Sequence, residues 1–90
     1  PFTAVAGDQI FVNTTSAVVT VNLPASPEAG DTVTIIDVRN YFGSNKCTVG
    51  RNGKNILNAA ADLDLTTNKM SVTLVYTDAT CGWNYLSKAT

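Results

Sequence analysis

The stretch from Leu23 to Asp37, which reads LPASPEAGDTVTIID, most constrains what this chain can fold into. Pro24 and Pro27 each fix the backbone angle φ and lack an N–H group, so neither can lie in the middle of a sheet. Gly30 then gives the backbone freedom to turn before the chain extends again. The next segment, Thr32–Val38, is rich in β-branched residues, which suit the pleated surface of a sheet. The stretch therefore predicts a turn followed by a strand.

Apolar and polar residues alternate in two segments, Ala17–Leu23 and Met70–Thr77. This period of two is typical of a half-buried antiparallel strand. Thr32–Val38 differs because its apolar residues fall on both faces, so we expect it to be central in a sandwich or covered by a partner. The other expected strands are short: Phe2–Val5, Gln9–Asn13, Lys46–Arg51, Asn55–Leu57, Asp62–Leu65 and Trp83–Ser87.

This pattern predicts one all-β domain over residues 1–90, a small antiparallel β-sandwich or a partly open barrel of about eight short strands. Asn52-Gly53 adds the signature of a type I′ hairpin turn, because both central positions of that turn need positive φ. A chain of 90 residues buries only a small core, so it would gain stability from disulfides, a metal or oligomerisation. Charged residues make up only 14% of the chain, against about 25% in average domains, which favours a surface covered by other proteins. Extracellular β-domains also have such surfaces.

The residue types that most catalytic and metal sites need are scarce. The chain has no histidine, which removes the commonest general base and the usual catalytic triads. Its two cysteines lack the spacing of a zinc or redox site, and no glycine pattern matches a phosphate-binding loop. The six cations are scattered, and no apolar run approaches the length of a membrane span. We therefore expect no enzyme activity, no cofactor, no metal, no nucleic-acid partner and no membrane partner.

The carboxylates leave three interpretations open. Asp62 and Asp64 fall on one face of a predicted strand, and Asp31, Asp37 and Asp78 lie elsewhere. Oxygen ligands on neighbouring loops could hold Ca²⁺, and two carboxylates could form a glycosidase pair. A solvated strand face and turn-capping aspartates are the simpler interpretation, which we favour.

The cysteines and the first residue bear on where the protein is made. Cys47 alternates with Val49 on one strand face, so we expect it in the core, whereas Cys81 lies in a turn and is expected to be partly exposed. Two reduced thiols are favoured, although a disulfide between them stays open because sequence gives no distance. The chain begins at Pro1, as removal of an initiator methionine would leave it. We expect a complete small protein, while a fragment would look the same.

One loop carries the best candidates for contact with a partner. Tyr41 and Phe42 are two aromatic residues in a segment that is expected to be an exposed loop, and Arg39 and Asn40 beside them could supply polar contacts at the rim of an interface. Trp83 is expected in the core. A sugar-stacking platform formed by the aromatic residues is the alternative.

Several turn and strand motifs occur together along the chain: Leu23-Pro24 before Ala29-Gly30-Asp31, Val33–Asp37, Thr48-Val49 before Arg51-Asn52-Gly53, and Val72–Tyr76 ending at Gly82-Trp83. With these motifs the chain resembles a β-rich domain that recurs in structural proteins of tailed phages, notably marine and cyanobacterial ones. The resemblance covers nearly the whole chain, including its opening Ala4–Asp8, and it specifies the fold better than the role. It provides no catalytic residues, and Cys47 and Cys81 have no counterpart in it.

The resemblance implies a structural protein of the virion. A one-domain chain without a stalk would fit a small capsid decoration (cement) protein, which binds the major capsid protein of the assembled shell and stabilises it. By analogy with phage decoration proteins we expect a homotrimer on the capsid surface, assembled in the host cytoplasm. The alternative is a module of a tail fibre or appendage that binds a host-surface receptor or glycan. A hydrolase is the least favoured reading.

Overall fold

The computed structural model describes residues 2–90, which form eight β-strands in two four-stranded sheets. Sheet A has the strand order β1-β3-β5-β6, and sheet B has the order β2-β4-β7-β8. Among residues 2–90 no helix is long and apolar enough to cross a membrane. The strands are β1 (Phe2–Thr3), β2 (Gln9–Val12), β3 (Val19–Asn22), β4 (Thr32–Asp37), β5 (Cys47–Gly50), β6 (Leu63–Leu65), β7 (Ser71–Tyr76) and β8 (Trp83–Ala89).

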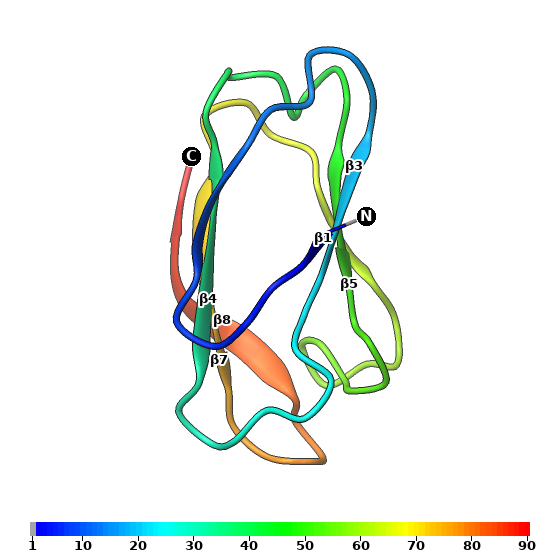
Figure 1. Ribbon diagram of the computed structural model, residues 1–90, viewed down its shortest axis with the longest axis vertical. Coiled ribbons are helices and arrows are strands. Elements are labelled where there is room, and N and C mark those ends of the chain that lie inside the picture. Colours follow the sequence, from blue (N-terminus) through cyan, green and yellow to red (C-terminus); the bar gives the residue numbers. More distant parts are fainter. Residues whose placement is uncertain (1) are drawn as a thin grey trace.

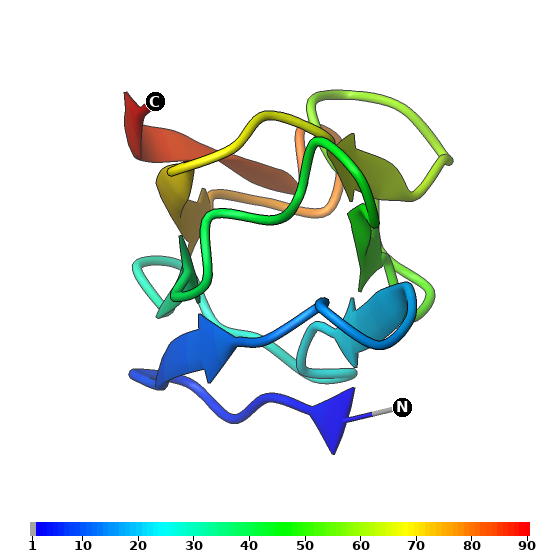
Figure 2. The ribbon, with the colours of Figure 1, turned by 90° about the horizontal axis from the view of Figure 1, so that it is seen from above.

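The two sheets face each other as the layers of a sandwich (Figure 1), which confirms the predicted all-β fold of about eight short strands. The first five strands alternate between the sheets, so the chain crosses from one layer to the other after each of the first four. These crossings are visible from above (Figure 2). The last strands instead follow one another within a sheet, β5 with β6 and β7 with β8.

The expectation that the sheets are antiparallel throughout is wrong. β1 pairs with β3, β3 with β5 and β2 with β4 in parallel, whereas the pairs β4–β7, β5–β6 and β7–β8 are antiparallel. Where the chain visits the other layer for a single strand and then returns, the two strands of the same sheet run in the same direction; between β4 and β7 it visits two strands, and that pair is antiparallel. Period-two alternation reports that one face of a strand is buried, and it carries no information about the direction of the neighbouring strand.

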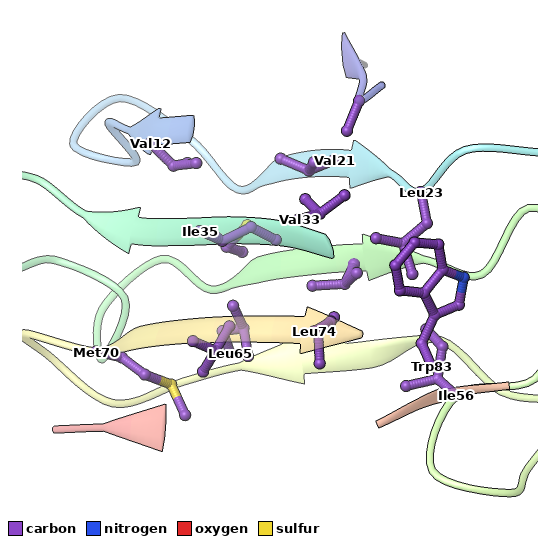
Figure 3. Packing of buried hydrophobic residues seen from close by; sticks show 14 of the residues in the cluster. Val12, Val21, Leu23, Val33, Ile35, Ile56, Leu65, Met70, Leu74 and Trp83 are labelled. Atoms are coloured by element: carbon purple, nitrogen blue, oxygen red, sulfur yellow. The ribbon is translucent and has the colours of Figure 1, made fainter. Parts of the chain in front are cut away.

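Alternate residues of the strands point inward and fill the space between the sheets with one hydrophobic core. Trp83 and Cys47 are fully buried there, as predicted. Trp83 lies edge-on to Tyr76, with 5.5 Å between the ring centroids. Figure 3 shows how the inward-facing side chains of the two sheets meet. The fully buried members of the core also include Val21, Leu23, Val33, Ile35, Val49, Leu65, Val72 and Leu74.

The predicted turn at Asn52-Gly53 forms, but the predicted return strand after it does not. Both residues have positive φ, 50° and 88°, and the Lys54 N–H donates to the Arg51 carbonyl across the turn (3.1 Å). The chain then makes only isolated bridges at Ile56, because Leu57 and the residue after it adopt left-handed backbone angles that end an extended run. The antiparallel partner of β5 is β6, which begins later in the chain.

Candidate interaction surface

The outer face of sheet B is without charge. In register, Gln9, Thr34, Thr73 and Ser87 form one row across the sheet, Phe11, Ile36, Ser71 and Ala89 form a second, and Thr32, Val75 and Asn84 form a third. None of these side chains is ionisable. We call this surface the Phe11 face. Its residues are short hydroxyl, amide and apolar side chains, and covering them costs less than covering charged side chains, provided that the hydroxyl and amide groups find hydrogen-bond partners.

Exposed apolar side chains gather at one corner of the Phe11 face. Phe11 is 67% exposed and lies beside Ile36 on the neighbouring strand. Val38 follows on the same side of the chain and is 48% exposed. Its N–H donates to the carbonyl of Val12 (3.3 Å), which holds it against the end of β2. An aromatic residue flanked by aliphatic ones is the composition found at the centres of protein interfaces.

A hydrogen bond between two hydroxyl groups joins neighbouring strands in the middle of the face. The Thr34 and Thr73 hydroxyls lie 2.9 Å apart in a hydrogen bond between β4 and β7. The sequence left two explanations open for the apolar residues on both faces of β4, a central position in the sandwich or cover by a partner. β4 lies inside its sheet, between β2 and β7, and Ile36 on its outer side is half-buried. Cover by a partner stays a prediction.

A buried carboxylate fixes the loop that carries the predicted contact residues. Asp37 ends β4, is only 4% exposed, and accepts hydrogen bonds from the N–H groups of Tyr41 (3.0 Å), Phe42 (3.0 Å) and Lys69 (3.1 Å). A carboxylate has enough lone pairs to take all three donors. The carboxylate therefore ties the loop after β4 to the turn before β7, and the loop is a fixed part of this end of the sandwich.

The structure separates the four predicted contact residues. Arg39, Asn40 and Tyr41 are exposed, Tyr41 by 37% of its surface. Phe42 is 1% exposed, so the expectation that it is an exposed aromatic is wrong. Its ring joins the hydrophobic core, and the hydrogen bond from its N–H to Asp37 holds it in that position. Contact of Arg39, Asn40 and Tyr41 with a partner stays a prediction.

Sequence reasoning missed Phe11 as part of a surface. The alternation of Gln9–Asn13 does place Phe11 opposite the core side, and that of Thr32–Val38 does the same for Ile36 and Val38. What joins them is the parallel pairing of β2 with β4, which brings residues 25 positions apart into register. That pairing has no signal in the sequence.

The outer face of sheet A is different in character. Thr20, Thr48 and Asp64 form a row across β3, β5 and β6. The Asp64 carboxylate accepts from the Thr48 hydroxyl (3.1 Å) and from the Lys46 ammonium group (3.2 Å), which makes an exposed ion pair. Asp62 accepts from the N–H of Arg51 (2.9 Å), as a turn-capping aspartate does. Within residues 2–90 no group of three or more His, Cys, Asp or Glu side chains is placed to hold a metal ion.

The two cysteines are not joined. Cys47 is buried in sheet A, and Cys81 is half-buried in the turn after β7. Burial, with a smaller contribution from the charge of Asp37, raises the pKa of the Cys47 thiol to about 12. The charge of Asp78 is the main cause that raises the pKa of Cys81, and the backbone hydrogen bond from Cys81 is the main cause that lowers the pKa of Asp78.

No pocket opens in the surface that residues 2–90 form. What this geometry offers for recognition is therefore a broad face, the Phe11 face, with the Val38–Tyr41 loop at its corner. A scan against protein-family models finds no match for the chain, and a search of curated proteins finds none either.

Proposed function

We propose that this protein is a structural protein of a phage virion, a capsid decoration protein that binds the assembled shell through the Phe11 face. The observation that carries the proposal is the uncharged outer face of sheet B, with Phe11, Ile36 and Val38 exposed or half-exposed on it. The resemblance of the turn and strand motifs to phage structural domains supplies the biological setting. The major capsid protein is the proposed partner, and a homotrimer is the proposed assembled unit.

Physical chemistry favours a protein as the occupant of this face. Covering a charged side chain costs free energy unless a partner charge is supplied, and the Phe11 face has no such side chain. Covering Phe11 and Val38 removes apolar surface from water, which contributes roughly 25 cal/mol per Å². A phenyl ring near the centre of such a contact is a typical hot spot.

The dimensions of the face predict weak binding by each copy. Four strands about 4.8 Å apart and six residues of about 3.3 Å each give a footprint of roughly 400 Å², about half the area that one partner buries in a standard interface. The Val38–Tyr41 loop would have to extend the contact. Decoration suits such a site, because many copies that bind only the assembled shell stabilise it by mass action.

The first test is the copy number of this polypeptide in purified virions, measured by quantitative mass spectrometry against the major capsid protein. The proposal predicts a ratio close to that of the capsid subunit. A ratio at the level of tail proteins would overturn decoration and favour the appendage alternative, in which host-surface receptors or glycans are the partners.

The second test asks whether the Phe11 face is the contact. Val38→Ser and Val18→Ser are matched variants, because the two valines are 48% and 50% exposed and only Val38 lies at the Phe11 face. Shells that lack the protein should bind the Val18→Ser variant as they bind the unchanged protein, and bind the Val38→Ser and Phe11→Ser variants less tightly. Equal binding of all four proteins would remove the Phe11 face from the proposal.

A further inference from the structure

The charges of sheet B are separated along the strands. Its strands run along the length of the molecule (Figure 1), so each has one end at the top and one at the bottom of that view. Three cations lie where β4 ends, where β7 begins and near the end of β8. They are Arg39, Lys69 and Lys88, and we call this the Arg39 end.

Carboxylates occupy the opposite ends of the same strands. Asp8 precedes β2, Asp31 precedes β4 and Asp78 follows β7. Glu28 lies in the turn before β4, and its N–H donates to the Asp31 carboxylate (2.9 Å). We call this the Asp31 end. Neighbouring strands are about 4.8 Å apart, so each end presents a row of like charges rather than isolated ones. The uncharged Phe11 face lies between the two rows.

Among residues 2–90 neither row is paired with an opposite charge. The ion pair that is found there joins Lys46 to Asp64 on sheet A, and the Lys88 ammonium group lies over the Tyr85 ring, 5.3 Å from its centroid. Asp37 does lie near the Arg39 end, but it is buried and its oxygens are occupied by three backbone donors. The molecule is 34 Å long, about four Debye lengths at physiological salt, so the two rows are screened from each other within one copy.

We infer that two copies of this chain associate head to tail, with the Arg39 end of one against the Asp31 end of the next. The two rows carry opposite charges, and every copy of the chain has both rows. A second copy therefore provides a complementary surface for each of them. Such a contact is heterologous, so repeating it closes a ring when the rotation allows and otherwise extends a chain. It uses the strand ends and leaves the Phe11 face free, and it does not depend on any binding to a capsid.

The contact has a distinct physical signature. Exposed charge pairs hold partners weakly and mainly orient them, so the association is weak and strongly sensitive to salt. At about 0.01 M salt the Debye length is about 30 Å, and at about 1 M it falls to about 3 Å. Association is therefore expected at low ionic strength and is lost at high ionic strength, which is the opposite of what burial of apolar surface predicts.

The test is sedimentation velocity of the full chain over a concentration series at about 0.01 M and about 1 M salt, with three variants that each change one charge and with the Phe11→Ser variant. Arg39→Glu and Lys54→Glu each change the formal net charge from −1 to −3, but Lys54 lies in the turn after β5 and not at the Arg39 end. Glu28→Lys changes the net charge from −1 to +1, so it leaves the magnitude unchanged. None of the three side chains makes a hydrogen bond or ion pair within residues 2–90.

We expect the association constant at low salt to fall at least tenfold in Arg39→Glu and in Glu28→Lys, and to stay the same or rise in Lys54→Glu. Circular dichroism of each variant checks that the fold is kept. A protein that stays monomeric at every salt concentration overturns the inference. An equal fall of the association constant in Lys54→Glu also overturns it, because net charge alone would then explain the effect. The same holds for an association that persists in Glu28→Lys but is lost in Phe11→Ser, because the copies would then pack through their Phe11 faces.

Discussion

The two sheets of this sandwich are alike on the inside and different on the outside. Both bury alternate aliphatic residues, such as Val33 and Ile35 in sheet B and Val21 and Val49 in sheet A. Outside, sheet A carries the exposed Lys46–Asp64 pair, whereas sheet B carries uncharged rows with charges only at the strand ends. The core explains the common inside. The core does not require an uncharged outside, so the core alone does not explain why the two outer faces differ.

The largest expected effect compares one carboxylate from each sheet. Asp37→Ala leaves three backbone N–H groups without their acceptor at a buried position, so it should lower the free energy of unfolding by about 3 kcal/mol. Asp64→Ala removes an exposed ion pair on sheet A and should cost less than about 1 kcal/mol. Urea denaturation of both variants measures the difference. Similar losses would mean that Asp37 does not organise its loop.

A smaller effect is expected from placing the same charge on each outer face. Ile36→Lys puts an ammonium group beside Phe11, among the exposed apolar side chains of the Phe11 face, and Thr20→Lys puts one on sheet A. Cosedimentation with shells that lack the protein should show binding weakened more than tenfold, about 1.4 kcal/mol, by the first change. Binding of Thr20→Lys should be unchanged. A reversed order would assign the contact to sheet A.

The cysteines allow a comparison by pH. Because the pKa of Cys47 in the folded protein, about 12, is above the ordinary value of 9.0, its contribution to stability is complete below pH 9 and is lost as the pH rises toward 12. At pH 10 the loss is about 1 kcal/mol. Between pH 8 and pH 10 the Cys47→Val variant should therefore lose less stability than the unchanged protein, and thermal unfolding at both pH values would measure the difference.

A maleimide should label the Cys81 thiol in the folded protein and the Cys47 thiol only after unfolding.

The smallest effect concerns the hydroxyl pair of sheet B. Thr34→Val alone leaves the Thr73 hydroxyl without its partner and should cost about 1 kcal/mol or less. The double variant Thr34→Val and Thr73→Val replaces both hydroxyls by methyl groups of similar shape and should be close to neutral for folding. Thermal unfolding of the three proteins checks the order. A double variant that is less stable than the single one would show that the pair supports the sheet by more than this bond.

Local features of this fold were readable from the sequence. The alternating strands, the turn at Asn52-Gly53, and the burial of Trp83 and Cys47 depend on residues within a few positions of each other. The direction of neighbouring strands could not be predicted, because the chain crosses between layers and the residues of one strand do not indicate which strand it pairs with. The same reason explains the candidate site. Phe11 joins Ile36 only through β2–β4 pairing.

The loop after β4 shows the same limit at the level of single residues. Tyr41 and Phe42 are adjacent in the sequence and have similar character, yet one is exposed and the other is buried. What separates them is the carboxylate of Asp37, which also holds Lys69 from a turn 32 residues away. A pattern of residue types predicts that such a loop exists, and only the distant contact decides which side chain faces outward.

The alternation of the first five strands between layers has a consequence for synthesis. β2 hydrogen-bonds to no strand except β4, and β4 needs β7 to cover its other edge, so most of sheet B cannot close until Tyr76 has left the ribosome. Pairings between distant segments form slowly, and their unpaired edges are prone to aggregation while they wait. A truncated product lacking the last third of the chain would expose the apolar edge of β4. Each copy can therefore complete the pairing of β2, β4 and β7 only after Tyr76 has been synthesised.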